Sequence, residues 1–298
     1  MNDTIVNLDD VRQRIRSLDS VPIVPAIFRP LLGQLNRPAE DVKIGSLVEL
    51  VSCENSLAAK CLHMANSPLF GRSKEVNTIR GAVIALGIQR LHAILLSACM
   101  IDIFRANAGE IDATVFWEHS FATALVSQQF ARKIRHKDPE KVYLCGLLHD
   151  LGLILSLVVF PEQLKKAFAL SRARSIPLEV AERDTFGFSH CETGAVAAQE
   201  WNLPKEAAEA IRFHHAPNFQ DHEDIVAMVH LCDRLCQVGG LGYGYNLMVG
   251  VDLLDDPAWN ALTMHHPDLR KLDLARFTFE LESYFVEVRK MVAVLFRV

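Results

Sequence analysis

Basic residues are in the minority in this chain of 298 residues, which holds 31 Lys and Arg against 36 Asp and Glu and has a formal net charge of −5. Nucleic-acid-binding domains usually carry a basic excess or a basic stripe. The one basic cluster, at residues 132–137, falls at the end of a predicted helix, where cations suit the helix dipole. We therefore expect no nucleic-acid partner.

The sequence also lacks a paired-cysteine motif. It has seven cysteines, an odd number, and each lies among apolar residues: Cys53, Cys61, Cys99, Cys145, Cys191, Cys232 and Cys236. Such cysteines are typical of reduced core positions in a cytosolic protein. Cys232 and Cys236 are one helical turn apart, but no nearby residue completes a thiolate zinc site.

Long uninterrupted hydrophobic runs are missing as well, although 50% of the residues are hydrophobic. The best candidate for a membrane span, residues 81–104, contains Gln89, Arg90 and His92, so we predict two core helices there instead. The first residues lack the basic segment of a signal peptide. We expect a cytoplasmic protein without a membrane partner.

Strand-like alternation is nearly absent, and helical periodicity dominates. One apolar stripe consists of Leu91, Ile94, Leu95, Ala98 and Ile101. Ser189 and Glu192 have the spacing of a capping box, which predicts that His190 lies in the first turn of a helix. Pro139 and Pro204 are each predicted to begin a helix. The predicted fold class is therefore all-α.

A glycine-rich break at residues 239–244 precedes the C-terminal region. No predicted strand comes before it, so a phosphate-binding loop is a weak interpretation. The chain then ends in a predicted long helix with heptad spacing, at Leu274, Phe277, Leu281, Tyr284, Val288, Met291 and Leu295. We favour packing of this stripe on the protein's own core over a dimer interface, because short heptad runs are common on globular helices.

Histidine and aspartate recur in an ordered set along the chain. Its members are His119, His149, Asp150, His190, His214, His215 and Asp233. Imidazole and carboxylate bind divalent ions such as zinc, manganese or iron, and several helices can direct such side chains into a bundle core. A metal-bound water can lose its proton near neutral pH and attack phosphorus. We predict that these residues are metal ligands, with either or both of the paired histidines taking part.

Asp150 supplies the physical reason for this hypothesis. It lies inside the apolar stretch 146–152, and burial of an unpaired carboxylate costs several kcal/mol. A metal ion, another cation or several hydrogen-bond donors must therefore neutralise it. The alternative is a polar core without metal. We assign that plain structural role to His63, His92, His136, His222 and His265 and leave His230 open.

Several motifs taken together resemble the HDOD family, a branch of the HD superfamily of metal-dependent phosphohydrolases. The N-terminal motifs are Val21-Pro22-Ile23-Val24-Pro25, Asn66-Ser67-Pro68-Leu69-Phe70-Gly71 and the alanine-rich residues 82–87. Further landmarks are Trp117-Glu118-His119, His149-Asp150-Leu151-Gly152, Trp201-Asn202-Leu203-Pro204 and His214-His215-Ala216-Pro217. The resemblance covers about residues 20–237.

The resemblance implies an HD-domain-like helical bundle and three parts of the chain. These are an N-terminal helical part at 1–110, an HD-like core at 111–238 and a C-terminal helical extension at 239–298. The resemblance also implies bacterial signal transduction without established catalysis, and a signalling protein as partner. For Asn66 and Ser67 we expect a local role, such as capping a helix or fixing a turn.

Two departures from active relatives argue against catalysis. Leu153 stands where active HD enzymes usually carry a lysine, and Ala216-Pro217 follows the paired histidines where HD-GYP relatives, which hydrolyse cyclic di-GMP, carry Gly-Tyr-Pro. We therefore prefer a regulatory module with a divalent metal (Fe, Mn or Zn) held structurally. The alternative is a metal-dependent phosphohydrolase or phosphodiesterase acting on a nucleotide or cyclic dinucleotide. A homodimer is compatible with both.

Overall fold

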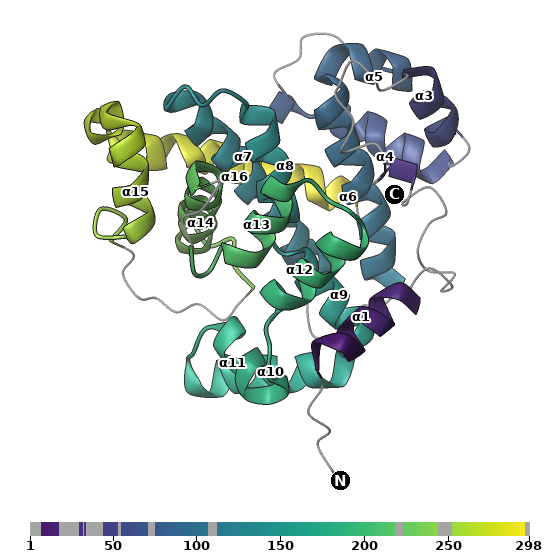
Figure 1. The fold of residues 1–298 in the computed structure, drawn as a ribbon. Coiled ribbons are helices and arrows are strands. Elements are labelled where there is room, and N and C mark those ends of the chain that lie inside the picture. Colours follow the sequence, from purple (N-terminus) through teal and green to yellow (C-terminus); the bar gives the residue numbers. More distant parts are fainter. Residues whose placement is uncertain are drawn as a thin grey trace.

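The computed structural model of the protein describes residues 7–17, 30–31, 33, 44–52, 55–70, 75–106, 112–217, 223–243 and 252–295. These ranges contain helices and no strand (Figure 1), which confirms the all-α class. The motif at residues 21–25 lies outside the described residues, as do Cys53, Gly71 and His222.

The first helices pack on the core in two separate groups, the first of them alone and the others together. They are α1 (Leu8–Ser17), α3 (Ile44–Ser52), α4 (Asn55–Ala65), the 3₁₀ turn η3 (Pro68–Phe70), α5 (Ile79–Leu86) and α6 (Ile88–Ala106). Helices α3 to α6 pack against one another, and α6 then contacts α8. Helix α1 lies elsewhere, against α12 and α9 (Figure 1).

The central helices build the core around α7. They are α7 (Ala113–Lys133), α8 (Pro139–Leu148), α9 (Leu151–Val159), α10 (Pro161–Arg174), α11 (Leu178–Phe186), α12 (His190–Glu200), α13 (Lys205–Phe213) and α14 (Glu223–Val238). Helix α7 contacts α8, α14 and α16, while α12 contacts α9 and α13. The capping box at Ser189 is present as predicted, so α12 begins at His190.

The C-terminal region comprises α15 (Pro257–His265), the 3₁₀ helix η4 (Pro267–Lys271) and α16 (Leu274–Leu295). Most of the heptad stripe on α16 is buried, including Phe277, Leu281 and Val288. This face packs on α7 and also reaches α4. The expected packing on the protein's own core is therefore confirmed, and the stripe is not available as a dimer seam. The division of the chain at residues 110 and 238 stays a prediction.

The two long apolar stretches of this chain form helices of the core. Residues 81–104 form two helices, α5 and α6, separated at Gly87, which has a φ of 81°. The expectation that residues 81–104 are the best candidate for a membrane span is wrong, because the one stretch of the described residues that is long and apolar enough by length and composition is Pro139–Val159. Its apolar window is 94% buried inside the fold, and the stretch breaks between α8 and α9.

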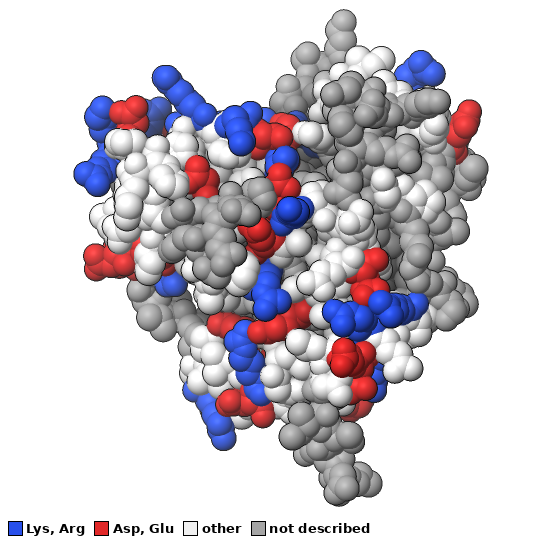
Figure 2. Space-filling model, in the orientation of Figure 1, with Lys and Arg blue, Asp and Glu red and all other residues white. Residues whose placement is uncertain are grey.

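Charged side chains of both signs are interspersed on the face shown in Figure 2. Two ion pairs join helices that are distant in sequence: Arg16 lies 2.7 Å from Glu200, and Lys141 lies 2.6 Å from Glu206. Exposed pairs of this kind stabilise a fold only weakly. The apolar core is therefore the main source of stability.

Asn66 has the local role that was expected for it. Its side-chain amide donates hydrogen bonds to the carbonyls of Leu62, at 2.9 Å, and Val76, at 2.7 Å. Its side-chain oxygen accepts from the backbone N–H of Val76 at 2.7 Å. One side chain thus ties the end of α4 to the segment that leads into α5.

Replacement of Asn66 by alanine should destabilise the fold. Loss of three hydrogen bonds to backbone groups is expected to lower the free energy of unfolding by about 1–3 kcal/mol. Urea denaturation of the wild type and of Asn66→Ala measures the difference. An unchanged unfolding midpoint would contradict this role for Asn66.

Candidate metal centre

The structure brings all seven predicted residues together inside the bundle, although they come from separate helices. Their positions are α7 for His119, the α8–α9 junction for His149 and Asp150, the start of α12 for His190, the end of α13 for His214 and His215, and α14 for Asp233. Six of the seven are at most 2% exposed, and the side chain of His215 is 18% exposed. The group is therefore shielded from bulk water except at His215.

One half of the centre consists of His119, His149, Asp233 and one oxygen of Asp150. Nε2 of His119 lies 3.2 Å from Nε2 of His149 and 3.0 Å from Oδ1 of Asp233. Nε2 of His149 lies 3.1 Å from Oδ2 of Asp150. One potential ligand atom from each of His119, His149 and Asp150 lies within 4.8 Å of the others.

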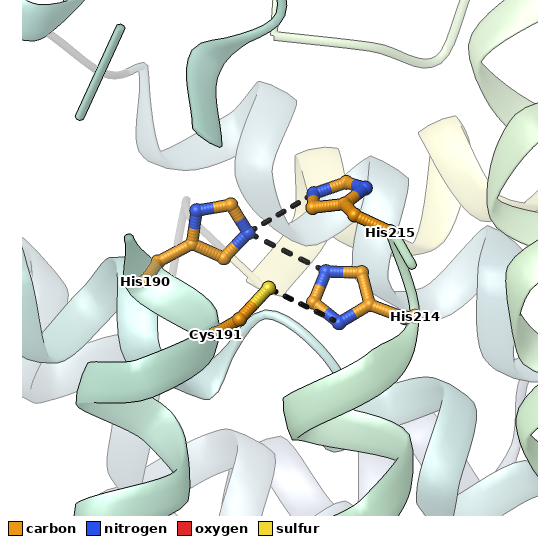
Figure 3. A group of neighbouring side chains, drawn as sticks. All are labelled: His190, Cys191, His214 and His215. Atoms are coloured by element: carbon orange, nitrogen blue, oxygen red, sulfur yellow. Dashed lines mark hydrogen bonds between the residues drawn. The ribbon is translucent and has the colours of Figure 1, made fainter. Parts of the chain in front are cut away.

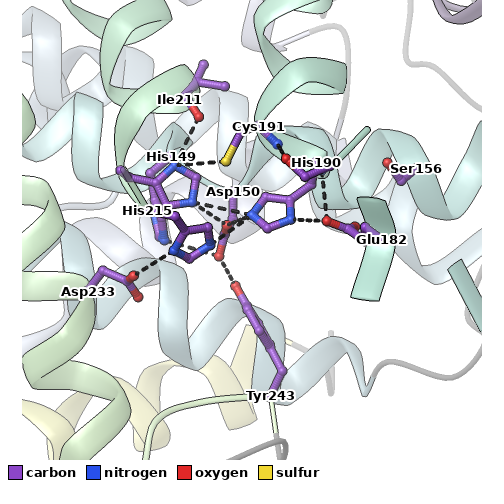
Figure 4. Close-up of polar contacts among 12 residues, drawn as sticks. His149, Asp150, Ser156, Glu182, His190, Cys191, Ile211, His215, Asp233 and Tyr243 are labelled. Carbon is purple, nitrogen blue, oxygen red and sulfur yellow. Dashed lines mark hydrogen bonds and ion pairs between the residues drawn. The ribbon is translucent and has the colours of Figure 1, made fainter. Parts of the chain in front are cut away.

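The other half contains the rings of His190, His214 and His215, which turn toward one another (Figure 3). Nε2 of His190 lies 3.4 Å from Nε2 of His214 and 3.1 Å from Nε2 of His215. The second oxygen of Asp150, Oδ1, lies 3.4 Å from Nε2 of His190 and 3.3 Å from Nε2 of His214. Asp150 therefore stands between the halves with one oxygen toward each (Figure 4).

The hydrogen bond that Nδ1 of a ring makes fixes the orientation of that ring, and so fixes which nitrogen faces the centre. The Nδ1–H groups of His119, His149 and His214 donate to backbone carbonyls at 2.6, 2.7 and 2.9 Å. A carbonyl oxygen only accepts, so Nδ1 carries the hydrogen and Nε2 of the neutral ring keeps its lone pair. Several lone pairs and carboxylate oxygens thus converge, an arrangement that a cation stabilises.

Two glycines hold α9 and α12 close enough to place His190 beside Asp150. A Cβ atom on Gly152 would lie 1.8 Å from the carbonyl oxygen of His190 and 2.6 Å from the backbone nitrogen of Gly194. Real atoms do not approach so closely, so only glycine fits at position 152. The glycine that follows the His-Asp pair therefore sets the separation of the two helices.

With this geometry in place, comparison with known proteins identifies the family. The HDOD domain model matches residues 21–217. The chain belongs to the HDOD family. The matched region ends before Asp233, whereas the sequence motifs indicated a resemblance as far as about residue 237. Asp233 reaches the HDOD centre from α14, beyond the matched region.

Solved structures share this fold over most of their length. An HDOD domain protein of unknown function from Geobacter sulfurreducens has 29% identity and a TM-score of 0.77, and the match covers 98% of this chain and 100% of that one. A Shewanella amazonensis SB2B protein provisionally assigned as a phosphohydrolase has 22% identity, a TM-score of 0.69 and coverages of 94% and 97%. A Marinobacter aquaeolei VT8 protein provisionally assigned to signal transduction has 20% identity, a TM-score of 0.70 and coverages of 99% and 68%. The last two show the fold alone.

One curated relative is considerably longer than the region it shares with this chain. It is an uncharacterized protein of Treponema pallidum (strain Nichols), 29% identical over 199 residues. These residues make up 66% of this chain and 38% of that protein. The shared region is therefore less than half of that relative.

Glu182 belongs to the HDOD centre but was not predicted from the sequence. It is 0% exposed, and its Oε2 accepts hydrogen bonds from the backbone N–H of His190 at 2.9 Å and from the ring Nδ1 at 2.6 Å (Figure 4). An outer carboxylate of this kind orients a metal-binding imidazole and makes it more basic. Glu182 lies on α11 and His190 on α12, so no helical spacing marks the pair.

Tyr243 is the second residue that sequence reasoning missed. Its hydroxyl donates a hydrogen bond to Oδ2 of Asp150, and its ring centroid lies 4.8 Å from that of His119. The carbonyl of Leu241 accepts from His119. The glycine-rich stretch after α14, interpreted from sequence only as a loop, therefore covers one side of the HDOD centre.

The remaining described histidines lie outside the two halves. His230, left open by the sequence, contacts the carbonyl of His214 through Nδ1, and its Nε2 lies 3.1 Å from Oδ2 of Asp256, the N-cap of α15. It therefore supports the segment that carries the paired histidines. His92 is buried, at 3% exposed, as expected of a core histidine. The core role expected for His265 is wrong, because its side chain is 50% exposed and lies on the surface, 2.8 Å from Asp224.

The charges in the HDOD centre depend on one another. Burial opposes ionisation of Asp150, but the neighbouring rings of His149, His190 and His214 together outweigh burial and hold the pKa of Asp150 well below its usual value. Burial also opposes ionisation of Asp233, but the hydrogen bond and charge of His119, with the charges of the other rings, together outweigh burial and lower the pKa of Asp233. Burial lowers the pKa of His119, yet Asp233 outweighs burial and raises it. In the metal-free protein, protons on the rings thus balance the carboxylates.

The residues present fit a divalent ion in each half. With the rings neutral, no described group donates a hydrogen bond to Oδ1 of Asp150 or Oδ2 of Asp233, although both atoms are buried. Imidazole and carboxylate ligands suit zinc, manganese and iron. A bound ion would compensate the negative charge of the carboxylates in place of the protons on the rings.

Gly152→Ala should disrupt the centre through packing. The added methyl group must push α12 away from α9, which is expected to lower the free energy of unfolding by about 1–3 kcal/mol or more and to reduce bound metal. Denaturation and elemental analysis measure both effects. Gly45→Ala on α3 is the control, because a Cβ there meets nothing within 4 Å. Equal behaviour of the two variants would show that the close approach does not matter.

Glu182→Gln should weaken metal binding without removing a ligand. Loss of the outer carboxylate charge is expected to lower affinity by about 10–100-fold. Titration against a chelator of known affinity measures the change. Glu162→Gln, an exposed position on α10, serves as the control and should bind metal like the wild type. Unchanged affinity in Glu182→Gln would remove Glu182 from the centre.

Proposed function

We propose that this protein is a non-catalytic signalling module of the HDOD family whose buried centre holds divalent metal. The observation that carries the proposal is the closure of the centre. Six of the seven candidate ligands are at most 2% exposed, and the hydroxyl of Tyr243 donates a hydrogen bond to Asp150. A phosphate substrate has to reach the metal-bound nucleophile, and a closed centre does not offer that access.

The environment of the His-Asp pair supports the same conclusion. Leu153, at the position where active HD enzymes usually carry lysine, is 0% exposed and part of the apolar core. A lysine there could contact a substrate phosphate, whereas leucine contributes only packing. The centre therefore keeps groups that can hold metal and lacks this cation for binding substrate.

Metal in this centre would connect helices that are far apart in the sequence. The ligands come from α7, the α8–α9 junction, α12, the end of α13 and α14. A bound divalent ion supplies positive charge and, where water can reach it, an acidified water molecule. In a closed site the first property remains, and binding of metal contributes directly to the stability of the fold.

Catalysis is the second candidate, and a specific arrangement favours it. Asp150 has one oxygen toward each half, so its carboxylate could contribute a ligand to each of two ions. The fold does not choose between the candidates, since the Shewanella and Marinobacter proteins with this fold carry a provisional phosphohydrolase and a provisional signalling assignment. A catalytic centre would act on a nucleotide or cyclic dinucleotide.

Under the preferred function we expect a cytoplasmic protein that signals through contacts with another protein. The overall charge of −5 supports a protein partner over nucleic acid. Association into a homodimer would have to use a surface other than the α16 stripe, because that stripe is buried against α7.

Metal analysis and a turnover assay test the proposed function together. Protein loaded with manganese, iron or zinc is expected to retain metal, to unfold at a lower temperature after chelation, and to show no turnover of bis(p-nitrophenyl) phosphate or cyclic di-GMP. His149→Ala should lose metal, while His63→Ala, a change on α4 outside the centre, should keep it. Turnover that disappears in both His149→Ala and Asp150→Ala would establish the catalytic alternative. Absence of metal would reduce the centre to a polar core.

A further inference from the structure

Cys191 lies inside one half of the metal centre, although the sequence indicated an ordinary core cysteine. It follows His190 on α12, is 3% exposed, and its Sγ lies 4.0 Å from Nδ1 of His214. One potential ligand atom from each of His190, Cys191, His214 and His215 lies within 4.8 Å of the others (Figure 3). Among the described cysteines, Cys191 alone belongs to such a group.

A second observation shows that this half needs a cation. Oδ1 of Asp150 is buried, lies 3.4 Å from Nε2 of His190 and 3.3 Å from Nε2 of His214, and receives no hydrogen bond from any described group when the rings are neutral. The Nδ1–H of His190 is held by Glu182, which directs Nε2 toward Asp150. The sulfur lies on the Nδ1 side of the His214 ring, and one potential ligand atom of each of the three histidines lies within 4.8 Å of it.

We propose that Cys191 supplies a thiolate ligand to the ion held by His190, His214 and His215. This proposal rests on the metal centre of the proposed function and adds one ligand to it. When the sulfur–metal bond forms, the thiol proton leaves to solvent, as metal binding to cysteine requires. The resulting negative charge, with that of Asp150, compensates a divalent ion.

The two halves would then differ in the metal they prefer. The half with His119, His149 and Asp233 offers only nitrogen and oxygen ligands. Thiolate is a soft ligand that favours zinc, ferrous iron and cobalt, whereas carboxylate and imidazole also accept manganese. The half with Cys191 should therefore select zinc or iron over manganese.

Cobalt substitution tests the proposal with a signal that does not depend on any enzymatic activity. A thiolate bound to Co²⁺ gives an intense charge-transfer absorption in the near ultraviolet, which nitrogen and oxygen ligands do not give. We expect this absorption in Co²⁺-loaded wild type and in Cys61→Ser, a matched change at a buried cysteine on α4. It should be absent in Cys191→Ser and Cys191→Ala, with folding of each variant verified by circular dichroism.

Competition between metals provides a second measurement. Loss of a residue that only supports a ligand typically weakens metal binding by about 10–100-fold. Loss of the ligand itself in Cys191→Ser should weaken zinc binding by at least as much. Manganese affinity should change much less, so the zinc-to-manganese preference falls. Cys61→Ser should retain the preference of the wild type.

The outcomes separate this proposal from the proposed function. Cobalt bound without the charge-transfer absorption would overturn the role of Cys191 and leave the metal centre intact. Absorption that persists in both Cys191 variants would assign the thiolate to another cysteine and also overturn the role. Failure of the wild type to bind cobalt, zinc or manganese would overturn the metal centre and this proposal together.

Discussion

Asp150 brings a negative charge to the junction of two apolar helices, α8 and α9, and the centre is arranged around that charge. An unbalanced carboxylate in such an interior costs several kcal/mol. Rings from α7, α12 and the end of α13 surround it, and their outer N–H groups are held by carbonyls or by Glu182. The held rings cannot turn away, so protons or metal ions must supply the balancing charge.

Close helix packing makes that arrangement possible. Gly152 lets α9 touch the backbone of α12 at His190, and the N-terminal capping box at Ser189 fixes where α12 begins. The segment after α14 then closes the centre, because Leu241 holds the ring of His119 and Tyr243 bonds to Asp150. The candidate ligands and the segment that covers them thus form one packed unit, so metal bound there would contribute to the stability of the fold.

The set of metal ligands in an HD-type centre and the access of a substrate to that centre are independent of each other. The same carboxylate and imidazole ligands can activate water in an open site or clamp helices in a closed one. In this protein the candidate ligands lie together, while Leu153 is buried in the core and Tyr243 donates a hydrogen bond to Asp150. Exposure and the neighbouring groups therefore argue for regulation more strongly than the ligand set argues for catalysis.

Helix positions were accessible from the sequence, because periodicity and capping depend on residues within a few positions of one another. The capping box at Ser189 and the break between α5 and α6 are examples. The motifs also indicated the HDOD family, which the family comparison confirmed. The order of histidines and aspartates named the seven residues that meet in the centre, although their role as ligands stays a prediction.

Other features were decided only by tertiary structure. Glu182 and Tyr243 reach the centre from elements whose local sequence gives no sign of it, and the sulfur of Cys191 lies beside imidazoles rather than in a purely apolar core. Which ring nitrogen faces inward depends on carbonyls up to 122 positions away, as for His119 and Leu241. The sequence alone determined the helices and the candidate ligands, whereas the packing of distant helices decided their partners, because contacts between distant segments leave no periodic pattern in either segment.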